Sequence, residues 1–323
     1  MKYSNNTKLV IVSPCYNEEK IIAESAARLD CVMGDLIAKD KISSESIILF
    51  VNDGSTDHTW DEIVKAHSLS SRICGVNMAI NVGHQTAIMA GMMASRSLAD
   101  AIITIDSDLQ DDINAIEHMI DKFHNGANVV YGVKNDRAID PWHKRKMASL
   151  FYKIQRFLGV KAIKNHADFR LLSRKALDTL ASYPEKNVFL RGLIPLMGYD
   201  AVEVDDVLSP RTNGKSKYTV SKQIHLAIDG ITSFTTKPLE HIFMAGVAMM
   251  VIAFLMLVYV TVSLIMGHVI AGWASLMLSL WFIGAILTMG VGLIGIYIGK
   301  MYLEIKHRPL YRIAKSIGLE IDK

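Results

Sequence analysis

Residues 242–299 contain no aspartate, glutamate, lysine or arginine. Two apolar runs fill this stretch, residues 242–266 and 273–298. Each exceeds the ~20 residues that a helix needs to cross a hydrocarbon core about 30 Å thick. A pair of core helices in a soluble protein is the alternative, but the charge-free stretch is far too long for it. The sequence therefore predicts two transmembrane helices, joined by the short link 267–272.

The flanks of these two runs are basic. Lys237 precedes them, and Lys300, Lys306, His307, Arg308, Arg312 and Lys315 follow. Two spans return the chain to the side on which it started, and basic flanks favour the cytoplasmic side. We therefore expect an integral protein of the cell (inner) membrane, with its N-terminal part and both termini in the cytoplasm. Residues 1–8 are polar and the apolar run 9–15 is short, so no secretory signal is expected there.

The overall composition excludes three classes of protein. Half of the 323 residues are hydrophobic, so the chain can bury enough surface to fold and is not intrinsically disordered. Its three cysteines, Cys15, Cys31 and Cys74, are too few and too irregular for a disulfide scaffold. A net charge of +3 is too small for a protein that coats nucleic acid, so no nucleic-acid partner is expected.

Short apolar runs alternate with helix-like stretches in the first 133 residues. The apolar runs are residues 9–13, 47–51, 73–80, 101–105 and 129–133. One helix-like stretch begins at residue 18, and three others cover residues 59–66, 84–95 and 113–123. Such alternation predicts βαβ units and a mostly parallel sheet. Ligands of these sheets bind at the carboxyl ends of the strands, where Asp53 and Asp106 follow two of the runs.

Two further segments have apolar residues at helical spacing, residues 147–158 and 220–234. Either helix could lie in the lipid interface or face an ordinary protein core. The second segment stands directly before the first predicted span, which favours the interface for it.

Asp106 and Asp108 are the strongest candidates for metal ligands. If the chain stays extended after its strand, residues two apart point the same way, so both carboxylates and Gln110 would share one side. Such oxygen ligands suit Mg²⁺ or Mn²⁺, which hold phosphates. For Asp111 and Asp112 we prefer a capping role at the start of the next helix.

Two polar loops each have two interpretations. The sequence NDGSTD (52–57) is either a turn that caps the next helix or a nucleotide site, in which Asp53 accepts hydrogen bonds from a base or ribose and Gly54 permits close approach. The loop 209–218 carries Arg211 and Lys217, which either attract anionic lipid headgroups or clamp phosphates. For the second loop the two interpretations are compatible.

Six motifs occur in a fixed order along the chain. They are PCYNEE (14–19), NDGSTD (52–57), NVGHQ (81–85), DSDLQD (106–111), ADFRLL (167–172) and GKSKY (214–218). Together they resemble glycosyltransferase family 2, in the polyprenyl-phosphate branch of dolichyl-phosphate mannose synthases and bactoprenol glucosyltransferases. The resemblance spans residues 9 to about 315, and the tail RPLYR (308–312) is most similar to the bactoprenol members.

The resemblance implies an α/β fold of the GT-A type: a Rossmann-like, mostly parallel sheet followed by interfacial helices and a two-helix transmembrane hairpin. The expected parts are a catalytic domain (1–218), a juxtamembrane interfacial helix (219–240), two transmembrane helices (241–299) and a basic tail (300–323). Tail residues 300–315 could pack on the catalytic domain or on a neighbouring subunit.

The resemblance also assigns residues to roles. It implies catalytic roles for Asp108, Asp168 and Arg170, and metal ligation by Asp106, Asp108 and Gln110. The residues implied at the nucleotide sugar are Pro14, Tyr16, Asn17, Glu18, Asp53, Gly54, Ser55, Asp106 and Gln110. Those implied at the acceptor phosphate are Arg145, Arg211, Ser216 and Lys217.

The implied reaction is an inverting, Mg²⁺- or Mn²⁺-dependent transfer of a hexose to polyprenyl (undecaprenyl) phosphate, with UDP-glucose as the favoured donor. A phosphate monoester has its second pKa near ~6 and is largely dianionic at neutral pH. We therefore expect Asp168 to orient Arg170 or a sugar hydroxyl rather than to act as a strong base. The candidate partners are the nucleotide sugar, the lipid, the bilayer and a second copy of the chain.

Three alternatives accompany this hypothesis. The acceptor could be another lipid such as diacylglycerol, and the donor could be UDP-N-acetylglucosamine or GDP-mannose. A membrane scaffold with a degenerate catalytic domain would have lost its metal carboxylates, whereas Asp106 and Asp108 are both present. The Gln-x-x-Arg-Trp box of processive synthases is absent from the sequence, which favours a single transfer.

Overall fold

The computed structural model describes residues 6–133, 166–185, 188–206, 237–266 and 272–320. These residues belong to two compact units. The first is an α/β unit that contains the described residues up to 206 together with residues 308–320. The second is a helical unit of residues 237–266 and 272–307.

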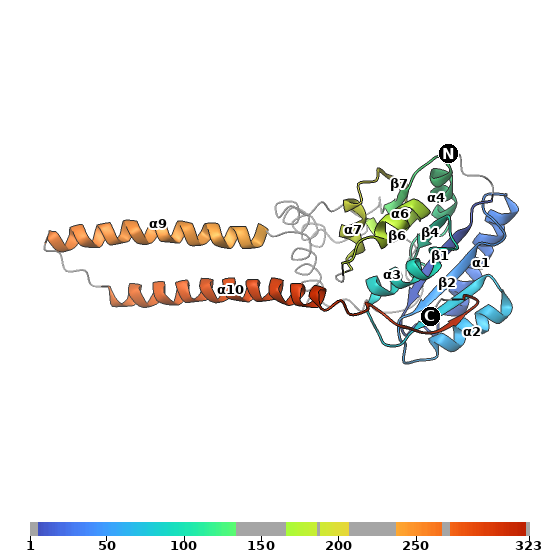
Figure 1. Cartoon of the computed structure of the whole chain (residues 1–323), viewed down its shortest axis with the longest axis horizontal. Helices are drawn as coiled ribbons and strands as arrows, with labels where there is room; N and C mark the ends of the chain where they lie inside the picture. Colours follow the sequence, from blue (N-terminus) through green and yellow to red (C-terminus); the bar gives the residue numbers. More distant parts are fainter. Residues whose placement is uncertain (1–5, 134–165, 186–187, 207–236, 267–271, 321–323) are drawn as a thin grey trace. The chain divides into compact units, whose positions relative to one another are not determined.

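An eight-stranded sheet forms the centre of the α/β unit, with the strand order β7-β5-β6-β4-β1-β2-β3-β8 (Figure 1). Strands β1, β2, β3 and β4 pair in parallel, as do β5 and β7, whereas β6 and β8 are antiparallel to their neighbours. The strands are β1 (Leu9–Cys15), β2 (Ile47–Asn52), β3 (Ile73–Met78), β4 (Ala101–Thr104), β5 (Val129–Val133), β6 (His166–Ser173), β7 (Ala201–Asp205) and β8 (Ile313–Ile317).

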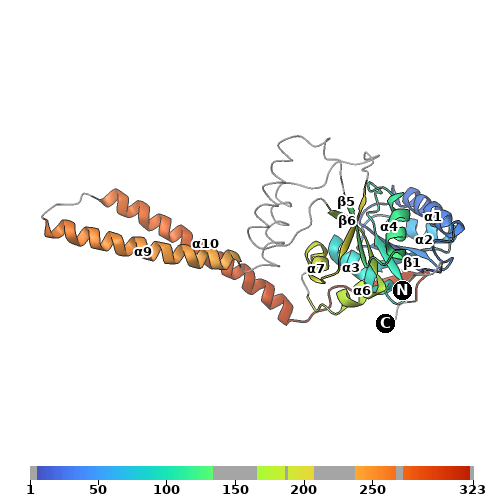
Figure 2. The same cartoon turned by 90° about the horizontal axis from the view of Figure 1, so that it is seen from above.

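Helices cover both faces of this sheet (Figure 2). One face packs against α1, α2 and α4, whose apolar residues share a core with Leu9, Ile11 and Phe50 of the strands. The other face packs against α3 and α6. The helices are α1 (Ile22–Ala38), α2 (Thr59–Leu69), α3 (His84–Ser95), α4 (Ala115–His124), α6 (Arg174–Ala181) and α7 (Leu190–Leu196).

Close packing of α3 depends on Gly91. A Cβ atom built there would lie 2.5 Å from Val12 Cγ1 and 2.6 Å from Val51 Cγ2, so a side chain would force the helix away from β1 and β2. Residues His84 and Gln85 begin this helix, and its fit against the sheet therefore fixes their distance from the strand ends.

The predicted alternation of strands and helices is confirmed for the first 133 residues, and so is the mostly parallel sheet. Strands β6, β7 and β8 and helices α6 and α7 were not predicted. Strand β6 carries two buried charged residues, Asp168 and Arg170. It therefore lacks the continuous apolar run that marks β1 to β5.

The last strand comes from the segment predicted as a basic tail. Strand β8 pairs with β3, with Ile317 opposite Gly75. The Cys74 thiol donates to the Gly318 carbonyl at 3.2 Å, and the Ala79 amide donates to the Arg312 carbonyl at 2.9 Å. Of the two placements left open for the tail, the structure therefore shows residues 312–318 on the sheet of the same chain.

The helical unit consists of α9 (Lys237–Ile265) and α10 (Trp273–Ile305), which contact each other. Within the described residues, one stretch is long and apolar enough to cross a membrane, Phe282–Ile305, and only 6% of its most apolar window is buried. The two-span hairpin therefore stays a prediction. The segments 147–158 and 219–236 and most of the link 267–272 lie outside the described residues.

We expect β8 to stabilise the α/β unit. A chain that ends at Leu310 loses the strand together with Ile317 and the buried Leu319. Loss of such apolar side chains should lower the free energy of unfolding by about 2–5 kcal/mol. Thermal unfolding of the full-length and shortened chains checks this, with a chain ending at Glu320 as the control. Equal unfolding temperatures for the Leu310 and Glu320 chains would contradict the prediction.

Candidate active site

The loops after β1 and β2 are joined by hydrogen bonds at the carboxyl end of the sheet. The Asn17 amide donates to Ser55 Oγ at 2.9 Å, and the Thr56 amide donates to Asn17 Oδ1 at 2.9 Å. Asn17 itself has a positive φ of 54°, a conformation that asparagine tolerates better than most residues. The Glu18 amide donates to Thr59 Oγ1 at 2.9 Å. The structure thus brings together Asn17 and Ser55, which were predicted at the nucleotide from two different motifs.

Asp53 is buried and holds the loop that leads into α3. Its carboxylate accepts hydrogen bonds from the Val82 amide at 2.7 Å, the Gly83 amide at 3.0 Å and Asn81 Nδ2 at 3.0 Å. Burial raises the pKa of Asp53, although the hydrogen bonds from the Val82 and Gly83 backbone amides oppose the shift. In this structure the carboxylate serves the protein's own loop, and its contact with a nucleotide stays a prediction.

Gly54 explains how that loop can pass so close. Its φ is +63°, and a Cβ atom there would lie 2.6 Å from the Asn81 amide nitrogen and 2.6 Å from the Ile80 carbonyl carbon. Both are backbone atoms, so no side-chain movement could make room. The close approach expected at Gly54 is therefore made by the protein's own backbone at residues 80–81.

The segment that follows β4 carries the predicted metal ligands. The chain does not stay extended here: it turns, and the Leu109 amide donates to the Asp106 carbonyl at 3.1 Å. The alternation survives the turn, because Asp106, Asp108 and Gln110 are partly exposed while Ser107 and Leu109 are buried. The expected extended conformation was therefore wrong, but all three predicted ligands are still partly exposed.

The chemistry of Asp106 fits a cation. Its Oδ1 atom is buried without a hydrogen bond among the described residues, and His84 Nε2 lies 3.4 Å from it. Burial raises the pKa of Asp106 to about 6; His84 opposes the shift, while nearby Asp168, Asp111 and Asp108 add to it. A divalent cation would supply the missing positive charge, and carboxylate and amide oxygens are the ligands that Mg²⁺ or Mn²⁺ prefers. Within the described parts of the chain, however, no three His, Cys, Asp or Glu side chains gather in a metal-binding arrangement.

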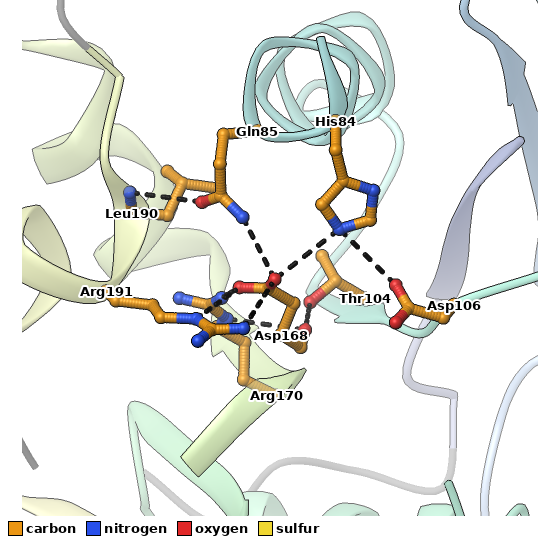
Figure 3. Close-up of polar contacts among 8 residues, drawn as sticks. All are labelled: His84, Gln85, Thr104, Asp106, Asp168, Arg170, Leu190 and Arg191. Atoms are coloured by element: carbon orange, nitrogen blue, oxygen red, sulfur yellow. Dashed lines mark hydrogen bonds and ion pairs between the residues drawn. The ribbon is translucent and has the colours of Figure 1, made fainter. Parts of the chain in front are cut away.

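Asp168 lies at the centre of a polar cluster beside this turn (Figure 3). The β4–β6 register puts Thr104 opposite Arg170, so Asp168 falls level with Asp106 beyond the end of β4. Its Oδ1 accepts from Arg170 Nη2 and, at 3.3 Å, from Arg191 Nε. Its Oδ2 accepts from Gln85 Nε2 at 2.9 Å and Arg191 Nη2 at 3.1 Å, and lies 3.4 Å from His84 Nε2. We call Asp168, Arg170, Arg191, His84 and Gln85 the Asp168 cluster.

The charges of Asp168 and Arg170 depend on each other. Arg170 is 0% exposed, and burial lowers its pKa while Asp168 opposes the shift. Burial also acts to raise the pKa of Asp168, but His84, Arg170 and Arg191 together hold it well below its ordinary value. Asp168 is therefore ionised across the neutral range, and a carboxylate with so low a pKa is a weak proton acceptor.

His84 joins the two parts of the site. Its Nε2 atom lies 3.4 Å from a carboxylate oxygen of both Asp106 and Asp168. Although burial acts to lower the pKa of His84, its contact with Asp168 and the charge of Asp106 raise it.

Sequence reasoning missed three members of the cluster. His84 and Gln85 lie in the quoted motif NVGHQ, which was a usable signal, whereas Arg191 lies in none of the six motifs. Arg145, Arg211, Ser216 and Lys217, predicted at the acceptor phosphate, lie outside the described residues. Pro14 lies in β1, and Tyr16 is exposed at the carboxyl end of that strand.

Comparison with known proteins points to one family. Residues 10–181 match the sequence profile of "Glycosyl transferase family 2". The chain is 42% identical to "Uncharacterized glycosyltransferase YkoT" of Bacillus subtilis, over 94% of this chain and 90% of that protein. It is 35% identical to the "SfII prophage-derived bactoprenol glucosyl transferase" of Shigella flexneri, over 96% of this chain and 98% of that protein. A glucosyl-3-phosphoglycerate synthase structure from Mycobacterium tuberculosis matches at 15% identity, covering 69% of this chain and 76% of that chain, with a TM-score of 0.43.

Asp168→Asn should destabilise the α/β unit strongly, because it leaves the Arg170 guanidinium buried without a counter-charge. Breaking a buried ion pair in this way costs about 3–5 kcal/mol. Urea unfolding of the full-length protein in detergent measures the cost. The control is Asp178→Asn, which removes an exposed carboxylate 3.7 Å from Arg96 and should cost less than about 1 kcal/mol. Similar costs for the two variants would show that Arg170 does not depend on Asp168.

Proposed function

The chain belongs to glycosyl transferase family 2 and is a glycosyltransferase, and on this premise we propose the reaction that it catalyses. It transfers a hexose from a nucleotide diphosphate sugar, with UDP-glucose favoured, to polyprenyl phosphate at the cytoplasmic face of the cell membrane. The observation that carries the proposal is the likeness to the bactoprenol glucosyl transferase, which covers 96% of this chain and 98% of that protein. This sequence likeness therefore extends beyond the residues of the sheet and includes the two long helices.

The connections of the sheet support a two-span anchor. Strand β7 precedes the apolar segment and β8 follows it, yet both strands belong to one sheet. A segment that leaves a domain and returns to it crosses a membrane an even number of times. Helices α9 and α10 have 29 and 33 residues, which at about 1.5 Å per residue exceeds a hydrocarbon core of about 30 Å. The basic flanks then favour the cytoplasm for the α/β unit and both termini.

The carboxyl edge of the sheet is the proposed donor site. Asp106, Asp108 and Gln110 would hold Mg²⁺ or Mn²⁺, which when bound supplies positive charge that stabilises the leaving nucleotide diphosphate. The nucleotide would lie over the loops that contain Asn17 and Ser55, where Tyr16 presents an exposed aromatic face. Because the Asp53 and Gly54 contacts fix these loops against α3, the donor site is largely preformed.

The Asp168 cluster explains why a phosphate is a suitable acceptor. Asp168 already accepts hydrogen bonds from Gln85, Arg170 and Arg191, and its low pKa makes it a poor base. An alcohol such as diacylglycerol would need a base to remove its proton, whereas a phosphate monoester is largely dianionic at neutral pH. We infer that the lipid phosphate attacks the anomeric carbon directly while the nucleotide diphosphate leaves. A single displacement of this kind inverts the anomeric configuration.

Transfer assays distinguish the acceptors. The purified full-length chain in nanodiscs should transfer radiolabelled glucose from UDP-glucose to undecaprenyl phosphate, and an α-linked donor should give a β-linked product. Matched nanodiscs with diacylglycerol in place of the polyprenyl phosphate should give no labelled lipid. Transfer to diacylglycerol alone, or to neither lipid across a panel of UDP- and GDP-sugars, would contradict the proposal.

Asp106→Asn should separate activity from stability. The raised pKa means that the ionised Asp106 disfavours the folded metal-free protein at neutral pH, so neutralising it should leave the unfolding temperature unchanged or higher. Glucose transfer should fall by about 10²–10³-fold, the typical cost of removing one group that stabilises transition-state charge. Asp61→Asn removes an exposed carboxylate on α2 and serves as the control. Wild-type transfer by Asp106→Asn would remove Asp106 from the site.

A further inference from the structure

Two arginines share the Asp168 carboxylate but differ in their access to solvent. Arg170 is 0% exposed, whereas 39% of the Arg191 side chain is exposed. Because Arg170 is sealed in the interior, Arg191 is the one of the two guanidinium groups bound to Asp168 that a solute can reach.

The position of Arg191 is fixed from three sides. Its neighbours Leu190 and Leu193 are buried and anchor α7 to the core. The Leu190 amide donates to Gln85 Oε1 at 3.3 Å, and the same Gln85 side chain donates to Asp168. Two of the five guanidinium donors, Nε and Nη2, are directed to the two oxygens of Asp168. The Arg191 head group is therefore held rigidly, unlike a typical surface arginine.

Arg191 and the proposed metal ligand lie on opposite sides of Asp168 (Figure 3). On one side, His84 links Asp168 to Asp106; on the other, Arg191 binds both carboxylate oxygens. The reaction brings two anions together, the donor diphosphate and the acceptor phosphate. Carboxylates repel a phosphate dianion. Because the proposed metal would neutralise the donor diphosphate, an acceptor phosphate beside these carboxylates requires a second positive group.

We propose that Arg191 binds the phosphate monoester of the acceptor and positions it for attack. The inference rests on the proposed function and adds to it a residue that lies outside all six motifs. Guanidinium groups bind phosphate oxygens through paired N–H donors in a fixed plane, so Arg191 fixes both the place and the orientation of the nucleophile. Asp168 and Gln85 act through Arg191 as positioning residues.

Arg191→Gln and Arg191→Lys test this assignment in the full-length chain. Arg191→Gln should raise the KM for undecaprenyl phosphate by about 10- to 100-fold, the range expected for a lost hydrogen bond to a charged group. The KM for UDP-glucose and the affinity for UDP with Mn²⁺ should stay within about twofold of wild type. Arg191→Lys keeps the positive charge but loses the paired N–H donors, so its KM for undecaprenyl phosphate should lie between those of wild type and Arg191→Gln.

A direct binding measurement makes the test independent of catalysis. Geranyl phosphate should bind the wild-type protein and lose about 10-fold or more in affinity for Arg191→Gln, while geraniol, which lacks the phosphate, should bind both equally weakly. Arg96→Gln is the matched control, because 42% of the Arg96 side chain is exposed and it pairs with Asp178 at 3.7 Å on another surface. If Arg191→Gln does not fold, the same measurement on Arg191→Lys decides.

Three outcomes would overturn the assignment. Unchanged geranyl phosphate affinity in both variants would show that Arg191 does not bind the acceptor. A raised KM for UDP-glucose with an unchanged acceptor KM would place Arg191 at the donor. Equal losses for geraniol and geranyl phosphate would indicate a lipid-tail contact. If wild type binds geranyl phosphate through Arg191 but transfers no sugar to polyprenyl phosphate, the proposed function fails and the assignment stands.

Discussion

The ion pair between Asp168 and Arg170 is the interaction on which the site depends. A guanidinium group with no exposed surface requires a counter-charge within the protein, and Asp168 supplies it from two residues away on the same strand. Residues two apart on a strand point to the same side, so one short stretch of β6 delivers both charges to one place. The antiparallel register with β4 then sets this pair beside Asp106, where the reaction is proposed to occur.

A second set of contacts connects the sheet to the same carboxylate through α3. Asp53 and Gly54, at the end of β2, fix the loop at residues 80–83, and that loop delivers His84 and Gln85 to Asp168. Gly91 allows α3 to lie close against the sheet. The cluster is thus held from β2, β6 and α7 together, an arrangement suited to a catalyst that works by positioning charges rather than by moving protons.

The sequence predicted the parts of the fold that have a local signal. Strands β1 to β5 are short apolar runs that alternate with helix-like stretches, so their existence could be predicted without the structure. Strand β6 could not, because its buried charges interrupt any apolar pattern. Strand β8 is a short edge strand with exposed Lys315, and its partner β3 lies far away in the sequence. For the site, Asp106, Asp168 and Arg170 came from recognisable motifs, whereas the roles of His84 and Arg191 depend on contacts with residues distant in the chain.

The account is tested most directly by the energetic coupling between Asp168 and Arg170. The free energies of unfolding of Asp168→Asn, Arg170→Met and the double variant form a thermodynamic cycle that isolates their interaction. If Asp168 serves chiefly to balance a buried cation, the double variant should be at least about 2 kcal/mol more stable than the sum of the single effects predicts. Effects that add to within about 0.5 kcal/mol would mean that the two residues are independent, and the organisation of the site around Asp168 would be wrong.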